Sequence, residues 1–326
     1  MTELRLGTRG SQLALWQAHA VQSRIAEAGG PPCRIAIIKT SGDRLQDAPL
    51  SEVGGKRLFV KEIEDALLRG EIDLAVHSSK DMPAILPDGL AIGAVLRRES
   101  PLDAVVFPRI PLSSSLTSID NLVSALGQTP SIGTSSVRRI AQLTRLLPNA
   151  RFEPIRGNLD TRLRKLDGGQ YDALVLAAAG LMRLGFADRI SMTLPAAACV
   201  PAPGQGIVAI EIRADDRRVH EAVAAIDDAD AAAALTAERA VIERLGGGCQ
   251  TPVGALATPM DEDAIELVAV VVSIDGSRAV REQSRGSRRD AAALGEAVGS
   301  RLLANGADEI LAEARRAQGA VEGIQP

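Results

Sequence analysis

The stretch Leu4–Val21, LRLGTRGSQLALWQAHAV, decides the fold of this 326-residue chain. Its first five residues predict a short strand, and the segment from Ser11 onward predicts a helix. The apolar residues of that segment recur at helical spacing, and the Ser11 hydroxyl can cap the first turn. The chain therefore begins with a strand that turns directly into a helix, which is how a βαβ unit opens.

The residues that follow complete this unit. A second strand is expected over residues 34–39, a helix over 60–68 and a buried strand over 74–76. Residues 41–56 show no periodicity and end in Gly54 and Gly55, so this long polar loop is a candidate lid. The alternation of strands and helices predicts a parallel sheet with helices on its faces.

The same order recurs from Asp103. Strands ending at 133 and 177 flank a helix over 137–147, and an apolar strand over 207–212 follows later. The pattern leaves open whether that last strand belongs to the second unit or returns to the first. An alanine-rich helix over 231–245, two strands joined by an Asp275–Gly276 turn and a final helix from near Asp290 predict a small α+β domain.

Composition excludes several classes of protein. The apolar content of 46% and the charged content of 24% are ordinary for a globular protein. The net charge of −4 and the aromatic content of 2% argue against nucleic-acid binding. The spacing of three cysteines and three histidines predicts neither disulfides nor a metal site. The longest apolar run is too short to span a bilayer and the acidic N-terminus is unlike a signal peptide, so we expect a cytoplasmic protein.

Arginine dominates the basic residues, since five of the 37 are lysines. Codon bias explains that count as well as function does, so position matters more. Two strand-to-helix turns, Gly7–Ser11 and Gly133–Arg139, combine backbone N–H groups, hydroxyls and arginines as anion sites do. Arg156 and Arg162 follow a further strand, and guanidinium groups bind carboxylates bidentately. Together they indicate a substrate with several carboxylates, although each alone also fits a capped helix or a surface residue.

One carboxylate follows the buried strand over 74–76, in the loop His77–Pro83. Ligands of open α/β sheets bind where the strands end, so Asp81 is a candidate for acid–base chemistry. The alternative is an Asx-turn, in which the Asp81 side chain bonds its own backbone. His77 is expected to be a core histidine.

A reactive thiol is indicated at Cys249. Three consecutive glycines, residues 246–248, precede it and leave it accessible. Cys33, in a predicted strand, and Cys199, beside an alanine run, fit the buried and inert state of most free cysteines.

Together these segments resemble the porphobilinogen deaminase family, in the same order through nearly the whole chain. No single stretch is decisive, but eight in register are specific. Two departures are Ser79, where the family often has Met, and Gln12, where Pro often follows the Ser; neither is a candidate site residue. The matching stretches are 8–11 with 13–17, 53–56 with 58–62, 77–83, 133–139, 156–158, 161–163, 203–206 and 247–250.

The resemblance implies an α/β fold with two lobes like those of periplasmic binding proteins, a cleft between them, and a small α+β C-terminal domain. Lobe 1 would comprise residues 1–101 and 203–224, lobe 2 residues 102–202, and the C-terminal domain residues 225–326. It also implies a monomeric transferase of tetrapyrrole and haem synthesis. Such an enzyme adds four porphobilinogen molecules to a dipyrromethane cofactor, releases ammonia and, after hydrolysis, releases hydroxymethylbilane.

The same resemblance implies roles for individual residues. Asp81 would be the catalytic residue, and Cys249 would hold the dipyrromethane through a thioether. Lys56 and Lys61 would belong to the lid. The substrate-binding residues would be Arg9, Ser11, Gln17, Arg183 and Gln205. The other cofactor-binding residues would be Ser78, Lys80, Thr134, Ser136, Arg138, Arg139, Arg156 and Arg162.

The chemistry of this substrate fits the residues independently. Porphobilinogen carries an acetate and a propionate, and each charge-assisted hydrogen bond to such a group contributes about 1.5–3 kcal/mol. When ammonia leaves, the ring nitrogen becomes positive, and one carboxylate can both protonate the amine and stabilise the cation. Two rivals fit less well. An exported solute-binding protein needs a signal peptide and has no use for Cys249, and a DNA-binding regulator needs a helix-turn-helix segment.

Overall fold

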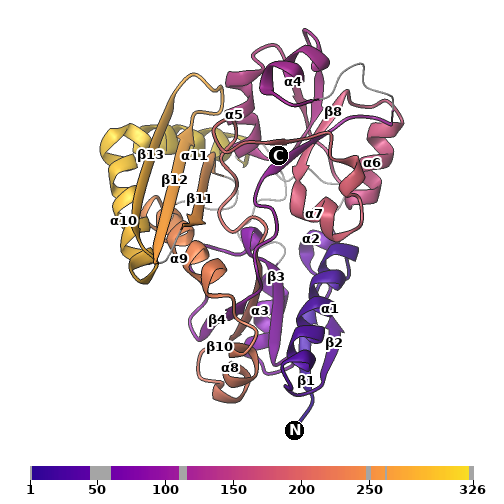
Figure 1. Cartoon of the computed structure of the whole chain (residues 1–326), viewed down its shortest axis with the longest axis vertical. Coiled ribbons are helices and arrows are strands. Elements are labelled where there is room, and N and C mark those ends of the chain that lie inside the picture. The colour runs from indigo at the N-terminus through magenta and orange to yellow at the C-terminus, as the bar shows by residue number, and fades with distance from the viewer. Residues whose placement is uncertain (1, 45–59, 110–115, 247–250, 261–262, 323–326) are drawn as a thin grey trace.

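The computed structural model describes residues 2–44, 60–109, 116–246, 251–260 and 263–322. In these ranges the strands form three sheets (Figure 1). The sheet nearest the N-terminus occupies one end of the long axis, the second sheet lies toward the other end, and the third lies beside the second (Figure 1). The predicted fold class, two α/β lobes with a small α+β C-terminal domain, is confirmed.

Lobe 1 is the unit around a five-stranded sheet of order β2-β1-β3-β10-β4. The pairs β1–β2 and β1–β3 are parallel, as the βαβ order predicts. The Ser11 hydroxyl caps the first helix by accepting a hydrogen bond from the Ala14 N–H. The strands are β1 Leu4–Thr8, β2 Cys33–Ile37, β3 Leu74–Ser78, β4 Leu90–Val95 and β10 Val208–Arg213, and the helices are α1 Gln12–Glu27, α2 Ser41–Arg44, α3 Lys61–Leu68, the 3-10 turn η1 Ser79–Asp81 and α8 Arg217–Ala224.

β10 is the strand whose place the sequence left open, and it returns to the sheet of lobe 1. Its register sets Val208 opposite Ser78 and Ile210 opposite Val76, antiparallel to β3. The sequence analysis predicted a parallel sheet, but the antiparallel β10 makes this sheet mixed. The reason is that β10 arrives from the other lobe and not through a crossover helix, so the rule that makes βαβ strands parallel does not apply to it.

Lobe 2 is the unit around a sheet of order β7-β6-β8-β5-β9. β6 is parallel to β7 and β8, whereas β5 is antiparallel to β8 and β9. The strands are β5 Asp103–Val106, β6 Ser131–Gly133, β7 Arg151–Glu153, β8 Ala173–Ala177 and β9 Met192–Leu194, and the helices are α4 Ile119–Leu126, α5 Val137–Leu146, α6 Leu159–Asp167, α7 Ala178–Arg183 and the 3-10 turn η2 Ala187–Arg189.

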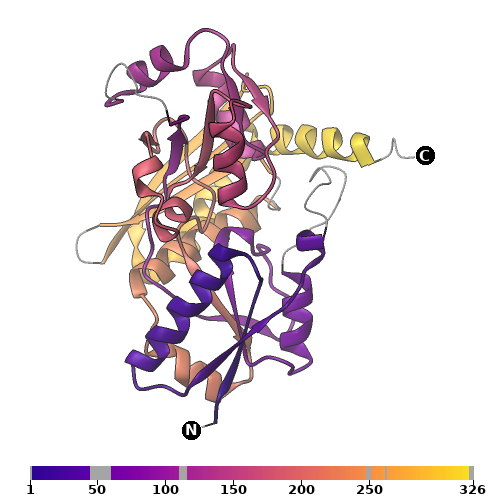
Figure 2. The ribbon, with the colours of Figure 1, turned by 90° about the vertical axis from the view of Figure 1, so that its right-hand side faces the viewer.

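The C-terminal domain holds a three-stranded antiparallel sheet, β11-β12-β13, against helices. The Asp275–Gly276 turn joins β12 to β13 as predicted, but β11 was missed because its Gly and Ala residues give a weak strand signal. The prediction of a single final helix was also wrong. The chain kinks at Gly306, whose φ is +93°, and this kink separates α10 from α11. The elements are α9 Ala229–Arg244, β11 Val253–Pro259, β12 Ala264–Val272, β13 Ala279–Ser287, η3 Arg288–Asp290, α10 Ala291–Leu302, η4 Leu303–Ala307 and α11 Asp308–Glu322. Figure 2 shows α11 extending away from the body.

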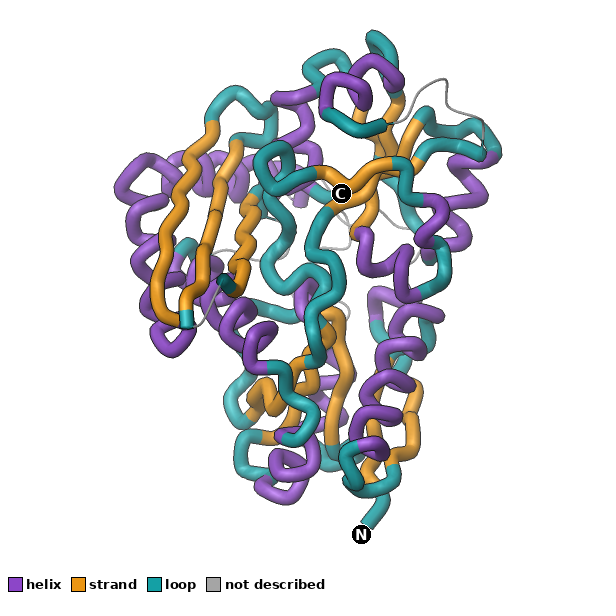
Figure 3. Tube along the Cα trace, viewed as in Figure 1, coloured by secondary structure: helices purple, strands orange, loops and turns teal. Residues whose placement is uncertain are grey.

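Two connections join the lobes, one between β4 and β5 and one between β9 and β10. They run as loops through the middle of the molecule (Figure 3). The two connections are hydrogen-bonded to each other, because the Glu99 N–H donates to the Gly206 carbonyl at 3.0 Å. The C-terminal domain braces them: Glu238 of α9 accepts from Arg98 Nη1 at 2.6 Å and from the Gly204 N–H at 2.6 Å.

Candidate active site

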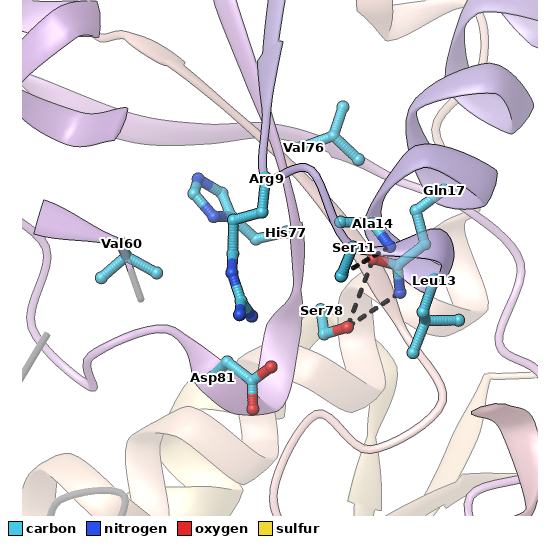
Figure 4. A pocket seen from close by; sticks show the side chains of 10 residues that line it. All are labelled: Arg9, Ser11, Leu13, Ala14, Gln17, Val60, Val76, His77, Ser78 and Asp81. Carbon is cyan, nitrogen blue, oxygen red and sulfur yellow. Dashed lines mark hydrogen bonds between the residues drawn. The ribbon is translucent and has the colours of Figure 1, made fainter. Parts of the chain in front are cut away.

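A pocket lies where β1 and β3 end and α1 begins (Figure 4). A hydrogen bond joins α1 to the end of β3 here, because Gln17 Nε2 donates to Ser78 Oγ at 2.8 Å. Strand ends of a parallel pair meet at one edge of a sheet, which is why residues so distant in sequence converge. The pocket is lined by five of the predicted site residues, Arg9, Ser11, Gln17, Ser78 and Asp81, and by Leu13, Ala14, Val60, Val76 and His77.

Asp81 ends the 3-10 turn that follows β3 and is partly buried. In Figure 4 the guanidinium end of Arg9 and the carboxylate of Asp81 extend toward each other. The negative charge of Asp81 also raises the pKa of Lys80 and of Arg162, opposing the larger effect of burial on both. The carboxylate therefore lies within a cationic environment to which both lobes contribute.

His77 is buried, as expected for a core histidine. Its Nε2 lies 3.1 Å from Oε2 of the buried Glu211, on the neighbouring strand β10. His77 also lines the pocket, so one member of this buried pair forms part of the pocket wall.

The second predicted anion site, at the start of α5, is a capped helix start. The Ser136 hydroxyl accepts a hydrogen bond from the Arg139 N–H at 3.4 Å, and Thr134 Oγ1 accepts from the Ser136 N–H at 3.4 Å. Arg138 and Arg139 lie in the first turn, where the helix dipole disfavours cations by about 0.3–1 kcal/mol. Both are nevertheless buried. Such a placement requires a nearby anion.

That anion is Asp103, the first residue of β5, which the sequence analysis missed. Arg138 binds it bidentately, with Nη1 2.7 Å from Oδ2 and Nη2 3.1 Å from Oδ1. Arg139 Nε donates to Oδ1 at 2.9 Å. Burial alone would raise the pKa of Asp103, but the two arginines outweigh it and hold that pKa well below its usual range. The sequence signal that could have identified Asp103 is its position as a charged residue at the start of an otherwise apolar strand.

Lys80 joins the same network through Gln205. Lys80 Nζ donates to Gln205 Oε1 at 3.4 Å, and Gln205 Nε2 donates to Asp103 Oδ1 at 2.9 Å. Burial and, next, the charge of Arg139 lower the pKa of Lys80 to about 8. Residues of lobe 1, of the second connection and of lobe 2 are thus linked in one chain of polar contacts.

Arg156 and Arg162 approach this network from lobe 2. Arg162 Nε donates to the Gly157 carbonyl at 2.9 Å, and burial, with smaller effects of Arg139 and Arg156, lowers the pKa of Arg162 to about 10. Burial also lowers the pKa of Arg156, whose Nη2 is buried without a hydrogen-bond partner. A buried donor without an acceptor is costly, and a carboxylate ligand would satisfy it.

The other candidates lie elsewhere. Arg183 Nη2 donates to the Gly206 carbonyl at 2.7 Å, and its guanidinium lies 5.5 Å from the centroid of the Trp16 ring, so it bridges α7 to α1 and the second connection. Lys61 is exposed and pairs with Asp65 at 2.8 Å. Lys56 and Cys249 lie outside the described residues.

The two described cysteines differ in burial. Cys199 is fully buried beside Asp103 and Arg138, and burial raises its pKa to about 12, as an inert thiol requires. Cys33 is partly buried, and burial raises its pKa as well. Neither thiol is therefore activated.

These residues fit a ligand rich in carboxylates. Among the described residues of this cluster, the cations Lys80, Arg138, Arg139, Arg156 and Arg162 outnumber the carboxylates Asp81 and Asp103. No group of three His, Cys, Asp or Glu side chains in the described ranges could hold a metal ion. In the described part of the chain no helix is long and apolar enough to cross a membrane.

The fold and the site together define a two-lobed α/β protein in which cations of both lobes surround the carboxylates Asp81 and Asp103. Two protein-family models match this chain and identify the family within that class. "Porphobilinogen deaminase, dipyromethane cofactor binding domain" matches residues 4–221, and "Porphobilinogen deaminase, C-terminal domain" matches residues 232–304. The chain belongs to the porphobilinogen deaminase family.

Individual relatives carry the same name. The porphobilinogen deaminase of Trichlorobacter lovleyi is 47% identical over 94% of this chain and 95% of its own length. That of Moorella thermoacetica is 45% identical over 99% of this chain and 100% of its own. Among solved structures, the VFT2 domain of BvgS from Bordetella pertussis matches with a TM-score of 0.40 and 16% identity, over 69% of this chain and 86% of that one.

Proposed function

We propose that this chain is a transferase that joins four porphobilinogen molecules head to tail on an enzyme-bound dipyrromethane. Four ammonia molecules leave, and hydrolysis releases hydroxymethylbilane. The observation that carries the proposal is the position of Asp81, at the end of β3 and among cations from both lobes, in a chain of this family. A substrate with two carboxylates on each pyrrole ring needs such cations, since buried anions without partners are prohibitive.

Cys249, which follows α9 in the sequence, would hold the cofactor through a thioether. When bound, the dipyrromethane supplies the two rings to which the others are added. Its carboxylates would be held by the side chains that surround Asp81 and Asp103. These are Ser78, Lys80, Thr134, Ser136, Arg138, Arg139, Arg156 and Arg162.

Asp81 would be the acid–base residue. Its carboxyl group donates a proton to the aminomethyl nitrogen of porphobilinogen, and the C–N bond breaks with its electron pair leaving on ammonia. The carboxylate that remains lies beside the positive charge on the substrate pyrrole and stabilises it. After the new C–C bond forms, the ring loses a proton, which Asp81 can accept. Catalysis of this kind contributes about 10²–10⁴-fold.

Substrate binding is proposed for the pocket at the end of β1. Arg9 and Ser11 line it and would hold a carboxylate of the incoming porphobilinogen, and Gln17 of α1 donates a hydrogen bond to Ser78. Gln205 and Arg183 would act from the second connection and from α7. Lys56 and Lys61 would belong to a lid.

The remaining parts of the proposal concern organisation. Residues 1–101 with 203–224, residues 102–202 and residues 225–326 would be the three domains, a division that the three sheets support. We further propose that the protein is a cytoplasmic monomer with no nucleic-acid partner, which suits an enzyme whose ligands are small molecules.

The test is the intact mass of the purified protein together with its turnover of porphobilinogen. We expect the wild type to exceed its sequence mass by one dipyrromethane, and Cys249→Ala to lose both that excess and the activity. Cys33→Ala is the matched control and should keep both. An adduct on Cys33 or Cys199, or a fully active Cys249→Ala, would overturn the assignment.

A further inference from the structure

Asp103 is the carboxylate on which the cationic cluster is built. It is fully buried at the head of β5, the first strand of lobe 2. Its oxygens accept hydrogen bonds from Arg138 at 2.7 and 3.1 Å, from Arg139 at 2.9 Å and from Gln205 at 2.9 Å. The Cys199 thiol lies 3.4 Å from Oδ2. One anion therefore orders two arginines and an amide.

The arginines need Asp103 for a physical reason. They are consecutive residues in the first turn of α5, where each feels the other's charge and the positive end of the helix dipole. Backbone carbonyls accept further hydrogen bonds from both: Arg138 Nη1 donates to the Val200 carbonyl at 2.8 Å, and Arg139 Nη1 donates to the Val175 carbonyl at 2.9 Å. Arg138 Nε is buried without a hydrogen-bond partner. The hydrogen bonds to Asp103 and to the carbonyls fix each guanidinium plane, and bidentate recognition of a carboxylate depends on that plane.

Asp103 also reaches the other lobe. Gln205 lies on the second connection and donates to Asp103 and to the Pro101 carbonyl on the first connection, at 2.7 Å. Its Oε1 accepts from Lys80 Nζ, one residue before Asp81. The position of Lys80 relative to the arginines of lobe 2 is thus set through Asp103.

We propose that Asp103 is a positioning residue of the reaction: its buried carboxylate holds Arg138 and Arg139 directly, and Lys80 through Gln205, so that cations of both lobes form one pre-organised site for cofactor carboxylates. The inference rests on the proposed function. A purely structural Asp103 would affect only the stability of the fold. A positioning Asp103 also affects the charge state of Lys80.

The test compares Asp103→Asn with Asp73→Asn. Asp73 is a suitable control because it is also buried and paired, with Arg5 Nη2 at 2.9 Å and Arg218 Nη2 at 3.5 Å, but it lies at the opposite end of β3 from Asp81. Both variants should lose thermal stability. Asp103→Asn alone should assemble its cofactor more slowly, by up to about 10²-fold, because misplacing the groups that orient a reactant costs rates of that order. Intact mass should therefore show a smaller loaded fraction for Asp103→Asn than for Asp73→Asn.

A second readout is the pH profile of the cofactor-carrying fraction. Lys80 faces Arg138, Arg139, Asp81 and Asp103, and the two carboxylates raise its pKa. Asp103→Asn removes one of them, so the pKa of Lys80 falls further and its proton is lost at lower pH. The alkaline limb of activity should therefore move to lower pH in Asp103→Asn and stay in place in Asp73→Asn and in Asp103→Glu.

The outcomes are distinguishable. A wild type without any dipyrromethane mass overturns the proposed function itself. A loaded wild type with an Asp103→Asn that matches Asp73→Asn in loading and in pH profile overturns the positioning role alone. If Asp103→Asn does not fold, Gln205→Leu is the deciding variant. It removes the hydrogen bonds that connect Asp103 to Lys80 and keeps those from Arg138 and Arg139 to Asp103. Normal cofactor loading of Gln205→Leu would overturn the proposal.

Discussion

Replacing Asp81 by Asn is the sharpest test of the proposed chemistry. The two side chains have the same shape, and asparagine makes the same Asx-turn, so a purely structural Asp81 predicts near-normal turnover. An acid–base Asp81 predicts a loss of about 10²–10⁴-fold. That loss corresponds to a barrier higher by about 2.7–5.4 kcal/mol, at 1.36 kcal/mol for each factor of ten.

The surroundings of Asp81 add a pH signature to that loss. Asp81 raises the pKa of Lys80, which burial and the neighbouring arginines have lowered to about 8. Without the carboxylate this pKa falls further, so Lys80 is protonated over a narrower range. The residual activity of Asp81→Asn should therefore decline at a lower pH than the activity of the wild type.

The assay is single-turnover release of ammonia from Asp81→Asn protein that has received its cofactor beforehand. Intact mass establishes that the protein is loaded, so a slow rate reports chemistry and not cofactor assembly. Asp88→Asn is the matched control, because Asp88 is an exposed aspartate in the loop that follows the same turn. We expect the rate of this control to equal that of the wild type.

A rate for loaded Asp81→Asn within a few-fold of the wild type would refute the reasoning. The Asx-turn would then explain Asp81, and the pocket would have to obtain its proton from another group. A large loss that is accompanied by failure to load would also contradict the argument, because it would assign Asp81 to assembly.

Two further predictions concern the connections between the lobes. Trp16 is the one tryptophan in the chain, and Arg183 lies over its ring, so Arg183→Gln should change the Trp16 emission spectrum and remove a contact of about 0.5–1 kcal/mol; an unchanged spectrum would contradict the stacked geometry. Gly206 has a φ of +88°, and an added Cβ would lie 2.3 Å from the Glu99 carbonyl oxygen. Gly206→Ala should lower the free energy of unfolding by about 1–3 kcal/mol or more, as measured by thermal melts. Gly185→Ala is the control: its φ is +76° but no atom lies within 4 Å of the added Cβ, so it should show only the smaller loss that comes from backbone strain.

The local elements of lobe 1 could be predicted from the sequence because their signals are local. The Ser11 cap and the helical spacing after it placed α1, and the apolar run before His77 placed β3. β10 could not be placed in the same way. Its partners β3 and β4 lie more than a hundred residues earlier, and no local signal records which sheet edge a returning strand will join.

The candidate site shows the same limit. Arg9, Ser11 and Asp81 were found because strand-to-helix turns and strand ends are recognisable along the chain. The position of the arginines at strand ends indicated a ligand with several carboxylates. Neither that pattern nor the family resemblance indicated that Arg138 and Arg139 already hold a carboxylate of the protein itself. Asp103 lies 35 residues from Arg138, so only the packed structure brings them together.

The division of labour between the lobes follows from these contacts. Lobe 2 contributes arginines whose geometry is fixed inside the lobe by Asp103, with contacts of 2.7–3.1 Å. Lobe 1 contributes Asp81 and Lys80, and the link from Lys80 to Gln205 is longer, at 3.4 Å. Like charges on facing lobes repel one another unless an anion lies between them. A chain of carboxylate-bearing pyrroles is such an anion, so the ligand itself supplies the charge that lets the cations of both lobes converge on Asp81.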